Sequence, residues 1–492
     1  MAALLVAGTT SDAGKSVFTT GLCRAAARRG LLVAPFKAQN MSNNSMVTRD
    51  GAEIGRAQWI QARAARAEPE AAMNPVLLKP GSDQRSHVVV MGHSAGEVSS
   101  RDFVDGRRHL QATAYDAFDD LASRYDLVLA EGAGSPTEIN LRSSDYVNMG
   151  LARHAAIPTV VVGDIDRGGV FAAMFGTVAL LGRQDQALVA GFVVNKFRGD
   201  RSLLAPGLLQ LEALTGRRVY GVLPWNPGLW LDSEDALDLA GRRSGVDGAL
   251  RVAVVRLPRI SNFTDVDALG VEPGVDVVFV SDPRALADAD LVVLPGTRAT
   301  LADLAWLRAR GLDTAVLAHA AAGKPVLGVC GGFQMLGRVI DDPAGVEGVA
   351  GASVPGLGLL DVSTEFRTEK VLRLSTGGAL GVDATGYEIH HGRITRGSDP
   401  EFLGGARAGG VFGTLWHGSL ESDGLRAALL AEVSRAAGKD WRSSGVVFAD
   451  RRERRLDLLG DLVEEHLDVE RLLELAHEGP GPLPFLPPGA TA

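Results

Sequence analysis

One cysteine followed by two glycines is the most chemically suggestive feature of the second half of the chain. Cys330 ends the apolar run Pro325–Val329, and Gly331 and Gly332 lead into a short helical stretch that begins at Phe333. A sharp strand-to-helix turn of this kind exposes a nucleophile above a sheet edge, and neighbouring glycines avoid a steric clash. The pattern predicts a nucleophilic thiol, with a buried core cysteine as the simpler alternative.

A glycine-rich segment that ends in lysine and serine lies near the N-terminus. The apolar strand Ala2–Ala7 leads into Gly8-Thr-Thr-Ser-Asp-Ala-Gly-Lys-Ser16, and a helical pattern follows over Val17–Arg29. The spacing is one residue longer than in the standard phosphate-binding loop, but strand, loop and helix stand in the required order. Backbone N–H groups of such a loop bind phosphate oxygens, the lysine neutralises phosphate charge and the serine hydroxyl can reach Mg²⁺. The nucleotide-binding residues expected here are Gly8, Thr9, Asp12, Ala13, Gly14, Lys15 and Ser16.

Charged side chains follow two further predicted strands of the first half. Lys37 follows Leu31–Pro35, and Glu131 follows Tyr125–Ala130. Ligands of α/β folds gather at the carboxyl ends of parallel strands. We therefore expect Lys37 to be a second phosphate cation, and Glu131 to hold Mg²⁺ together with Ser16. A solvated lysine and an exposed carboxylate beside a turn are the alternatives.

Three histidines of the second half could provide the base that a thiol of ordinary pKa requires. His417 has a glycine beside it and follows an apolar stretch, which is typical of a strand end. His390 and His391 compete for the same role.

The order of apolar segments predicts the fold class. Strands alternate with helical segments in both halves, which predicts an α/β protein with two doubly wound parallel sheets. We expect an ATP-dependent domain over residues 1–235, a polar linker over 236–250 and a second domain over 251–478. Helical spacing over 456–464 and 469–476 predicts C-terminal helices that pack on the second domain, and the proline-rich residues 479–492 are expected to be disordered.

Composition argues against two kinds of partner, nucleic acids and membranes. The chain has 492 residues, 46% of them hydrophobic, and a formal charge of -9 without a basic block, which argues against nucleic-acid binding. No apolar run is long enough to span a membrane. Cys23 and Cys330 lie too far apart in the sequence to suggest a disulfide framework, so we expect a cytoplasmic protein.

The motifs of the first half resemble the dethiobiotin synthetase group of phosphate-loop enzymes. The longer loop, Lys37, Glu131-Gly-Ala-Gly134 and Asn195 carry this resemblance. In that group ATP phosphorylates a carboxylate or carbamate. The resemblance implies ATP and Mg²⁺ as cofactors and adds Asn195 to the nucleotide site.

The motifs of the second half resemble class I glutamine amidotransferase domains. Matching segments are Leu294-Pro-Gly296, Gly328-Val-Cys-Gly-Gly-Phe-Gln334 and Thr414-Leu-Trp-His-Gly418. The resemblance implies that Cys330 attacks glutamine, that His417 is the base, and that N–H groups near Gly296 and Gly331 form the oxyanion hole. These enzymes usually carry glutamate two residues after the histidine, whereas Ser419 stands here. The resemblance therefore leaves open whether Glu421 or no acid orients His417.

Longer strings of both halves resemble the cobyric acid synthase family. They are Phe36-Lys-Ala-Gln-Asn-Met-Ser-Asn-Asn44, Val162-Gly-Asp-Ile-Asp-Arg-Gly-Gly-Val-Phe171, Asn195-Lys-Phe-Arg-Gly-Asp200 and Tyr387-Glu-Ile-His390. The resemblance implies ATP- and glutamine-dependent amidation of four peripheral carboxylates (b, d, e and g) of adenosylcobyrinic acid a,c-diamide, giving adenosylcobyric acid. The expected partners are the corrinoid, ATP and glutamine, and a homo-oligomer is left open. The alternatives are cobyrinic acid a,c-diamide synthase and an ATP-driven regulatory switch with an inactive amidotransferase module.

Overall fold

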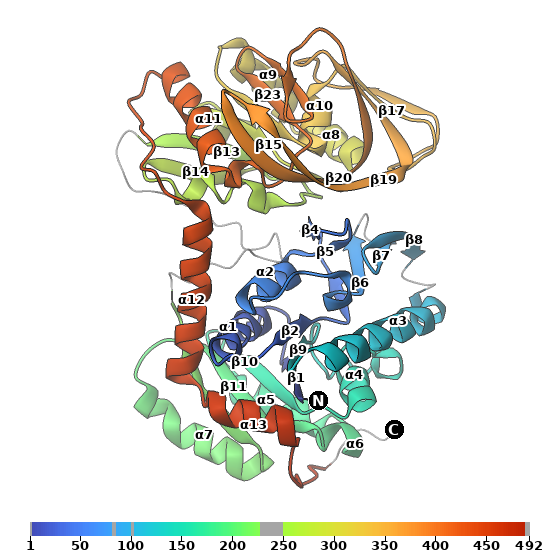
Figure 1. Cartoon of the computed structure of the whole chain (residues 1–492), viewed down its shortest axis with the longest axis vertical. Coiled ribbons are helices and arrows are strands. Elements are labelled where there is room, and N and C mark those ends of the chain that lie inside the picture. Colours follow the sequence, from blue (N-terminus) through green and yellow to red (C-terminus); the bar gives the residue numbers. More distant parts are fainter. Residues whose placement is uncertain (1, 81–84, 100–102, 227–248, 488–492) are drawn as a thin grey trace.

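The chain forms two parts, each built on its own mainly parallel sheet, in a computed structural model that describes residues 2–80, 85–99, 103–226 and 249–487 (Figure 1). Strands β1–β12 lie in the lower part of Figure 1 and β13–β23 in the upper part. This arrangement confirms the predicted α/β class with two sheets.

The first sheet has six strands in the order β12-β11-β10-β1-β9-β2, and every neighbouring pair is parallel. The strands are β1 (Ala2–Gly8), β2 (Val33–Phe36), β9 (Leu127–Glu131), β10 (Thr159–Asp164), β11 (Val189–Phe197) and β12 (Arg218–Pro224). Their carboxyl ends carry the phosphate loop, Lys37 and Glu131, as the strand pattern predicted, and Asn195 lies near the carboxyl end of β11.

Helices cover both faces of this sheet because the side chains of each strand alternate between them. Leu4 and Val6 of β1 join one apolar cluster with α1 (Lys15–Arg28). Ala3, Leu5 and Ala7 of the same strand point to the opposite face of the sheet. That second face is covered by α3 (Phe103–Arg124), α4 (Met149–Ala155) and α5 (Val170–Ala179). The remaining helices of the first part are α2 (Arg56–Ala64), α6 (Arg183–Gln186) and α7 (Arg201–Thr215).

The second sheet has the order β14-β13-β15-β16-β23-β22-β21. It is parallel from β14 to β23 and ends in two antiparallel strands. Its strands are β13 (Leu250–Val255), β14 (Val275–Val280), β15 (Leu291–Leu294), β16 (Val326–Val329), β21 (Glu401–Phe402), β22 (Gly405–Ala408) and β23 (Val411–Thr414). The helices of this part are α8 (Thr300–Ala309), α9 (Leu312–Ala321), α10 (Gly331–Leu336) and α11 (Asp423–Ala436).

Three smaller sheets, which the sequence did not predict, lie between and beside the two large ones. One is β3-β6-β7-β8, built from β3 (Gln39–Met41), β6 (Val76–Pro80), β7 (Arg85–Val90) and β8 (His93–Ser99). The others are the pair β4 (Ser45–Val47) and β5 (Glu53–Gly55), and the sheet of β17 (Val339–Asp342), β18 (Ala352–Pro355), β19 (Val362–Ala379) and β20 (Val382–Arg396). The long β19–β20 hairpin runs along the lower edge of the upper part, above β4 and β5 (Figure 1). Met46 and Val47 of β4 pack there against Tyr387 and Ile389 of β20.

The C-terminal helices correct one expectation. We expected them to pack on the second domain, but α12 (Phe448–His466) runs from the upper part to the lower part, and α13 (Val469–Glu478) lies on the lower part (Figure 1). Only Phe448, at the start of α12, belongs to the core of the second part. Leu456, Val463 and Leu472 join the α1 face of the first sheet.

Complementary charges stabilise the contact between α12 and α1. Arg24 and Arg28 of α1 face an acidic stripe on α12. Arg24 contacts Glu453 at 2.5 Å, and Arg28 contacts Asp461 at 2.6 Å. The helical spacing predicted the helices, whereas their partner depends on a match of charges that are far apart in the sequence.

The end of the chain also differs from the expected disorder. Pro484 accepts a hydrogen bond from Arg217 at 2.6 Å, and the backbone of Leu486 donates to Gln186 at 2.8 Å. Residues 488–492 lie outside the described residues, as does the expected linker up to residue 248. Leu250, its last residue, begins β13.

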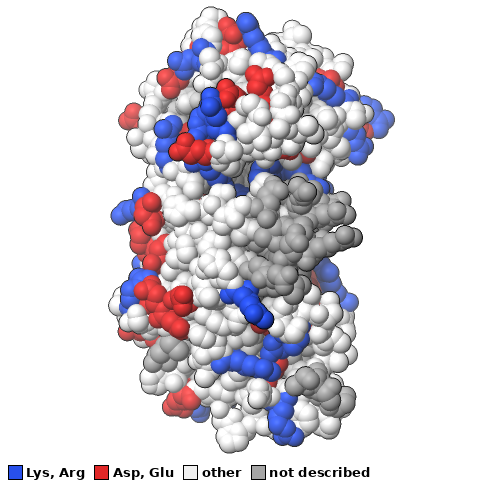
Figure 2. Space-filling model, turned by 90° about the vertical axis from the view of Figure 1, so that its right-hand side faces the viewer, with Lys and Arg blue, Asp and Glu red and all other residues white. Residues whose placement is uncertain are grey.

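Acidic and basic side chains are interspersed over the face seen in Figure 2. In the described parts of the chain, no helix is both long and apolar enough to cross a membrane.

Candidate active site

Cys330 lies at a sharp turn between strand β16 and helix α10, as the sequence predicted. Its φ of 50° and ψ of -109° are a strained conformation for a residue with a side chain. The turn is closely packed: a Cβ on Gly332 would stand 1.9 Å from the carbonyl oxygen of Leu294, and one on Gly331 would stand 2.6 Å from Thr297 Cγ2. The two glycines therefore allow the turn to pass the neighbouring strand end.

His417 follows strand β23 and is held by a carboxylate that the sequence did not predict. Its Nδ1 donates to Oδ2 of Asp265 at 2.7 Å, and the backbone N–H of Gly418 donates to the other oxygen at 2.8 Å. Both side chains are buried. Burial alone would lower the pKa of His417, but the negative charges of Asp265 and Cys330 raise it to about 10. The carboxylate of Asp265 therefore favours the imidazolium form of His417.

The loop that carries Asp265 is fixed against the strand end of β15. The backbone N–H of Ser261 donates to the carbonyl of Gly296 at 2.8 Å, and the hydroxyl of Thr297 donates to the carbonyl of Arg259 at 3.0 Å. The short 3₁₀ helix Phe263–Val266 then turns Asp265 toward the histidine. The sequence offered no local signal for this pairing because the two residues are 152 positions apart.

The competing residues have other partners. His390 contacts Glu388 at 2.9 Å through Nε2 and the carbonyl of Gly392 at 2.8 Å through Nδ1. His391 contacts the carbonyl of Arg367, and burial lowers its pKa to about 4. Glu421, the acid that the sequence left open, accepts a hydrogen bond from Arg56 of the first part at 3.0 Å. Asp265 therefore holds the position in which an acid can orient His417.

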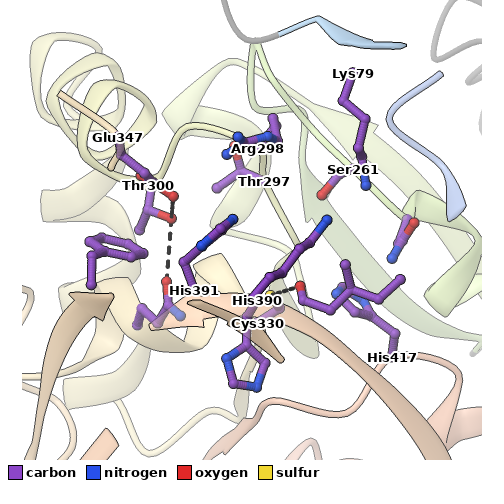
Figure 3. Close-up of a pocket in the computed structure, with 15 residues that line it drawn as sticks. Lys79, Ser261, Thr297, Arg298, Thr300, Cys330, Glu347, His390, His391 and His417 are labelled. Carbon is purple, nitrogen blue, oxygen red and sulfur yellow. Dashed lines mark hydrogen bonds between the residues drawn. The ribbon is translucent and has the colours of Figure 1, made fainter. Parts of the chain in front are cut away.

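Figure 3 shows that Cys330, His417 and the other labelled residues surround one pocket. The pocket is lined by both parts of the chain, since Lys79 belongs to β6 and Lys370 to β19. Both lysines contact the buried carboxylate of Glu53, Lys79 at 2.5 Å. The Ser45 hydroxyl donates to the same carboxylate at 2.7 Å, and the Ser45 backbone N–H donates to Asn262 across the interface at 2.9 Å. A buried ion cluster thus joins the two parts beside the pocket.

The two glycines expected at the oxyanion hole lie beside the reactive groups. A Cβ on Gly296 would stand 2.8 Å from Cε1 of His417. A Cβ on Gly331 would stand 3.2 Å from the backbone nitrogen of Thr297. Backbone from two different strand ends therefore lies close to Cys330 and His417.

The predicted nucleotide residues gather at the carboxyl edge of the first sheet. Lys15 donates to the carbonyls of Thr10 at 2.9 Å and Gly134 at 3.2 Å. Asn195 donates to the carbonyl of Ala13 at 3.0 Å. Gly8 and Thr9 continue from β1, and Asp12 accepts a hydrogen bond from Lys196 through its carbonyl. These hydrogen bonds hold the loop, the turn after β9 and the end of β11 together at one edge of the sheet.

Glu131 and Lys37 are both buried at this edge of the sheet. Glu131 is therefore not an exposed carboxylate beside a turn, and Lys37 is not a solvated lysine. Its Oε1 accepts hydrogen bonds from Ser16 at 3.0 Å and from Lys37 at 2.9 Å, and its Oε2 accepts one from Gln61 at 2.5 Å. Burial would raise the pKa of Glu131, but Lys37 lowers it. The Ser16 hydroxyl and the Glu131 carboxylate are hard oxygen donors of the kind that Mg²⁺ prefers, and they are adjacent.

Comparisons with known proteins agree with both halves of this picture. Residues 4–237 match the model of the CobQ/CobB/MinD/ParA nucleotide binding domain, and residues 251–425 match that of the CobB/CobQ-like glutamine amidotransferase domain. Over 496 residues, the chain is 72% identical to cobyric acid synthase from Mycolicibacterium gilvum (strain PYR-GCK), with 100% of both chains covered. It is equally similar, at 72% over 496 residues and 100% of both chains, to cobyric acid synthase from Mycobacterium marinum (strain ATCC BAA-535 / M).

The chain belongs to the cobyric acid synthase family. This confirms the resemblance that the motifs of both halves indicated, and the chain is therefore an enzyme of the glutamine amidotransferase class. In this member of the cobyric acid synthase family, Cys330 lies in the amidotransferase domain and the phosphate loop in the nucleotide-binding domain, which also contributes Lys79 to the cysteine pocket.

Proposed function

We propose that the chain amidates corrinoid carboxylates by combining two reactions, glutamine hydrolysis at Cys330 and carboxylate phosphorylation at the phosphate loop. The observation that carries the proposal is the buried Cys330–His417–Asp265 arrangement in a chain that also has an ordered phosphate loop. An amide does not form readily from a carboxylate and ammonia in water, so one domain activates the acid and the other supplies the nucleophile.

The glutaminase half follows from the geometry of the pocket. The Cys330 thiolate attacks the side-chain carbonyl carbon of glutamine, and N–H groups near Gly296 and Gly331 stabilise the oxyanion. The imidazolium of His417 donates a proton to the leaving nitrogen, so that ammonia departs and a thioester remains. Water then attacks the thioester, and neutral His417 accepts a proton from the water. Glutamate is released, and the Cys330 thiolate and the His417 imidazolium are restored.

Asp265 is a positioning residue in this scheme. Its carboxylate fixes the ring orientation through Nδ1, so that Nε2 is directed to the reaction, and its charge stabilises the imidazolium. Asp265, which precedes the cysteine in sequence, thereby takes the role of the glutamate that class I enzymes usually carry at the position of Ser419.

The synthetase half uses the phosphate loop. Loop N–H groups and Lys15 bind the phosphates of ATP, and a substrate carboxylate oxygen attacks the γ-phosphorus, giving an acyl phosphate and ADP. Ammonia then displaces phosphate to form the carboxamide. Ser16 and Glu131 would hold Mg²⁺, which supplies charge neutralisation between the phosphates when it is bound.

The substrate is proposed from the relatives. The two relatives reported above are named cobyric acid synthase, which favours adenosylcobyrinic acid a,c-diamide as substrate and four amidations at carboxylates b, d, e and g. An ATP-driven switch with an inactive amidotransferase module would not need a nucleophile and a carboxylate-held histidine in the same pocket.

Ammonium salt tests whether glutamine hydrolysis and carboxylate amidation occur at two separate sites. A Cys330→Ala variant should lose glutamine-dependent amidation but retain ATP-dependent amidation of the corrinoid when ammonium is supplied at raised pH. Cys23→Ala, which changes the other cysteine in the core beside α1, is the matched control and should retain both. Loss of ammonium-dependent amidation in a folded Cys330→Ala protein would contradict the proposal.

A further inference from the structure

Asn148, the residue directly before helix α4, carries a buried amide at the phosphate edge of the first sheet, and the proposed mechanism does not use it. Only 6% of Asn148 is exposed. Its Nδ2 donates to the carbonyl of Ala133 at 2.8 Å, two residues after Glu131. A carbonyl oxygen only accepts hydrogen bonds, so this contact fixes which end of the amide faces Ala133. The side-chain oxygen of Asn148 therefore points away from Ala133.

The side-chain oxygen Oδ1 of Asn148 is a buried acceptor, and none of the residues that the structure describes donates a hydrogen bond to it. A buried acceptor without a donor destabilises a fold, and most buried acceptors in proteins are paired. The oxygen lies against the backbone of Gly132, where a Cβ would stand 2.0 Å from it. Glycine at position 132 thus leaves the space that this oxygen occupies.

The backbone around Asn148 holds the oxygen in place. One carboxylate oxygen of Asp145 accepts hydrogen bonds from the backbone N–H groups of Val147 at 2.9 Å and Asn148 at 2.8 Å. The other accepts one from the N–H of Met149 at 2.9 Å. Together with the contact to Ala133, these bonds fix both the backbone and the side chain of Asn148. The acceptor is therefore preorganised, as a group that acts on a reacting ligand must be.

This acceptor lies near the proposed point of phosphoryl transfer. Lys15 donates to the carbonyl of Gly134 at 3.2 Å, one residue beyond Ala133. The backbone N–H of Gly132 donates to the carbonyl of Val6 at 2.9 Å, so the pairing of β9 with β1 continues past Glu131. Neighbouring residues of a strand point to opposite faces of the sheet. The acceptor beside Gly132 is therefore on the other face from the Glu131 side chain, which is proposed to hold Mg²⁺.

The hydrogen-bonding capacity of the reactants indicates which of them the acceptor fits. Phosphate groups, the substrate carboxylate and the acyl phosphate present oxygen acceptors to this edge and no N–H groups. Ammonia has three N–H groups, must reach the acyl carbon here, and is small enough for a nearly closed site. A carboxamide already present on the corrinoid is the other source of N–H donors, and the experiment below distinguishes the two.

We propose that Oδ1 of Asn148 accepts a hydrogen bond from ammonia and directs it to the acyl phosphate, which makes Asn148 a catalytic residue of the amidation step. The inference rests on the proposed amidation through an acyl phosphate. The lone pair of ammonia forms the C–N bond while the bond from the acyl carbon to the phosphate oxygen breaks. Phosphate leaves with that electron pair and accepts one proton from the nitrogen. With one N–H held by Asn148, the lone pair is directed at the carbon.

The test replaces the acceptor by an apolar group of similar size. In ammonium-dependent amidation without glutamine, Asn148→Leu should lower kcat/KM for ammonia by about tenfold or more. Acyl phosphate that ammonia does not capture is hydrolysed after release, so the ADP formed per carboxamide should rise. The KM for the corrinoid and the calorimetric affinity for ATP should stay within about threefold of the unmodified enzyme. The matched control is Asn140→Leu, the same substitution at an exposed amide, which should change none of these values.

A second variant moves the acceptor without removing a polar group. The Cβ of Gly132→Ala would displace Oδ1 of Asn148, since the two atoms would stand 2.0 Å apart. This variant should also lower kcat/KM for ammonia and raise the ADP formed per carboxamide. Glutamine hydrolysis at Cys330, which lies in the other domain, should persist in both variants and shows that they are folded.

Three results would overturn the inference. An unchanged kcat/KM for ammonia in Asn148→Leu would show that the acceptor does not act on the nucleophile. A higher KM for the corrinoid with unchanged kcat/KM for ammonia would assign the acceptor to a corrinoid carboxamide. An equal loss of ATP affinity would mean that Asn148 only supports the phosphate edge. Failure of the proposed function itself is distinguishable, because the unmodified enzyme would then form no carboxamide from ammonium.

Discussion

Nδ1 of His417 lies 2.7 Å from Oδ2 of Asp265, across 152 residues of sequence and in the interior of the second domain. Class I enzymes usually carry this acid two residues after the histidine, where this chain has Ser419. In this chain a buried carboxylate reaches Nδ1 of His417 from a loop that follows β13.

Removing the charge of Asp265 should slow glutamine hydrolysis. For Asp265→Asn we expect kcat to fall by about 100-fold or more with little change in KM, because the amide disturbs the tautomer and orientation of His417. Glutamate release measures this. The control is Glu421→Gln, which alters the other acid near the histidine loop and should have a much smaller effect on kcat. If Glu421→Gln lowers kcat more than Asp265→Asn, the orienting acid is misassigned.

The same substitution should change the pH dependence of glutamine hydrolysis. Asp265 and Cys330 raise the pKa of His417 to about 10, so the imidazolium persists well above neutral pH. Loss of a negative neighbour destabilises the imidazolium and lowers its pKa toward the ordinary 6.5. The basic limb of the kcat/KM profile should therefore move to lower pH in Asp265→Asn. An unmoved limb would show that Asp265 does not set the charge of His417.

A methyl group at Gly14 should damage the phosphate loop. Gly14 has a φ of 98°, and its Cβ would stand 1.8 Å from Nδ2 of Asn195. We expect Gly14→Ala to weaken ATP binding by about tenfold or more, measured by titration calorimetry, because loop and Asn195 must both move. Gly30→Ala is the matched control: its φ is 85°, but nothing lies within 4 Å of its Cβ. Equal ATP affinity in the two variants would argue against a phosphate site at this loop.

Neutralising Glu53 should destabilise the protein at the contact between its domains. Glu53→Gln leaves Lys79 and Lys370 buried without their shared counter-charge. We expect a loss of about 3–5 kcal/mol of unfolding free energy, as for other broken buried ion pairs. Denaturant unfolding followed by two probes, one in each domain, measures the loss. Asp282→Asn, which breaks an exposed pair with Arg284, should change little. Similar curves for both variants would contradict a structural role of the cluster.

Local sequence was sufficient for the parts of the molecule that depend on neighbours in the chain. Apolar strands followed by glycine turns predicted both parallel sheets, the turn at Cys330 and the phosphate loop. Glu131 and Lys37 could be placed at one edge because parallel strands present their carboxyl ends together. These inferences need only strand direction and turn chemistry.

Tertiary structure decided the relationships between residues that are remote in sequence. Only the packing of the loop after β13 against β15 brought Asp265 to His417. Only the interdomain contact brought Lys79 of the first domain into the cysteine pocket. Beyond its first turns, which contact the second domain, α12 packs on the first domain, where its acidic side chains meet the arginines of α1. Helical periodicity shows which face of a helix is buried, but the identity of its partner depends on shape and charge that only the folded chain brings together.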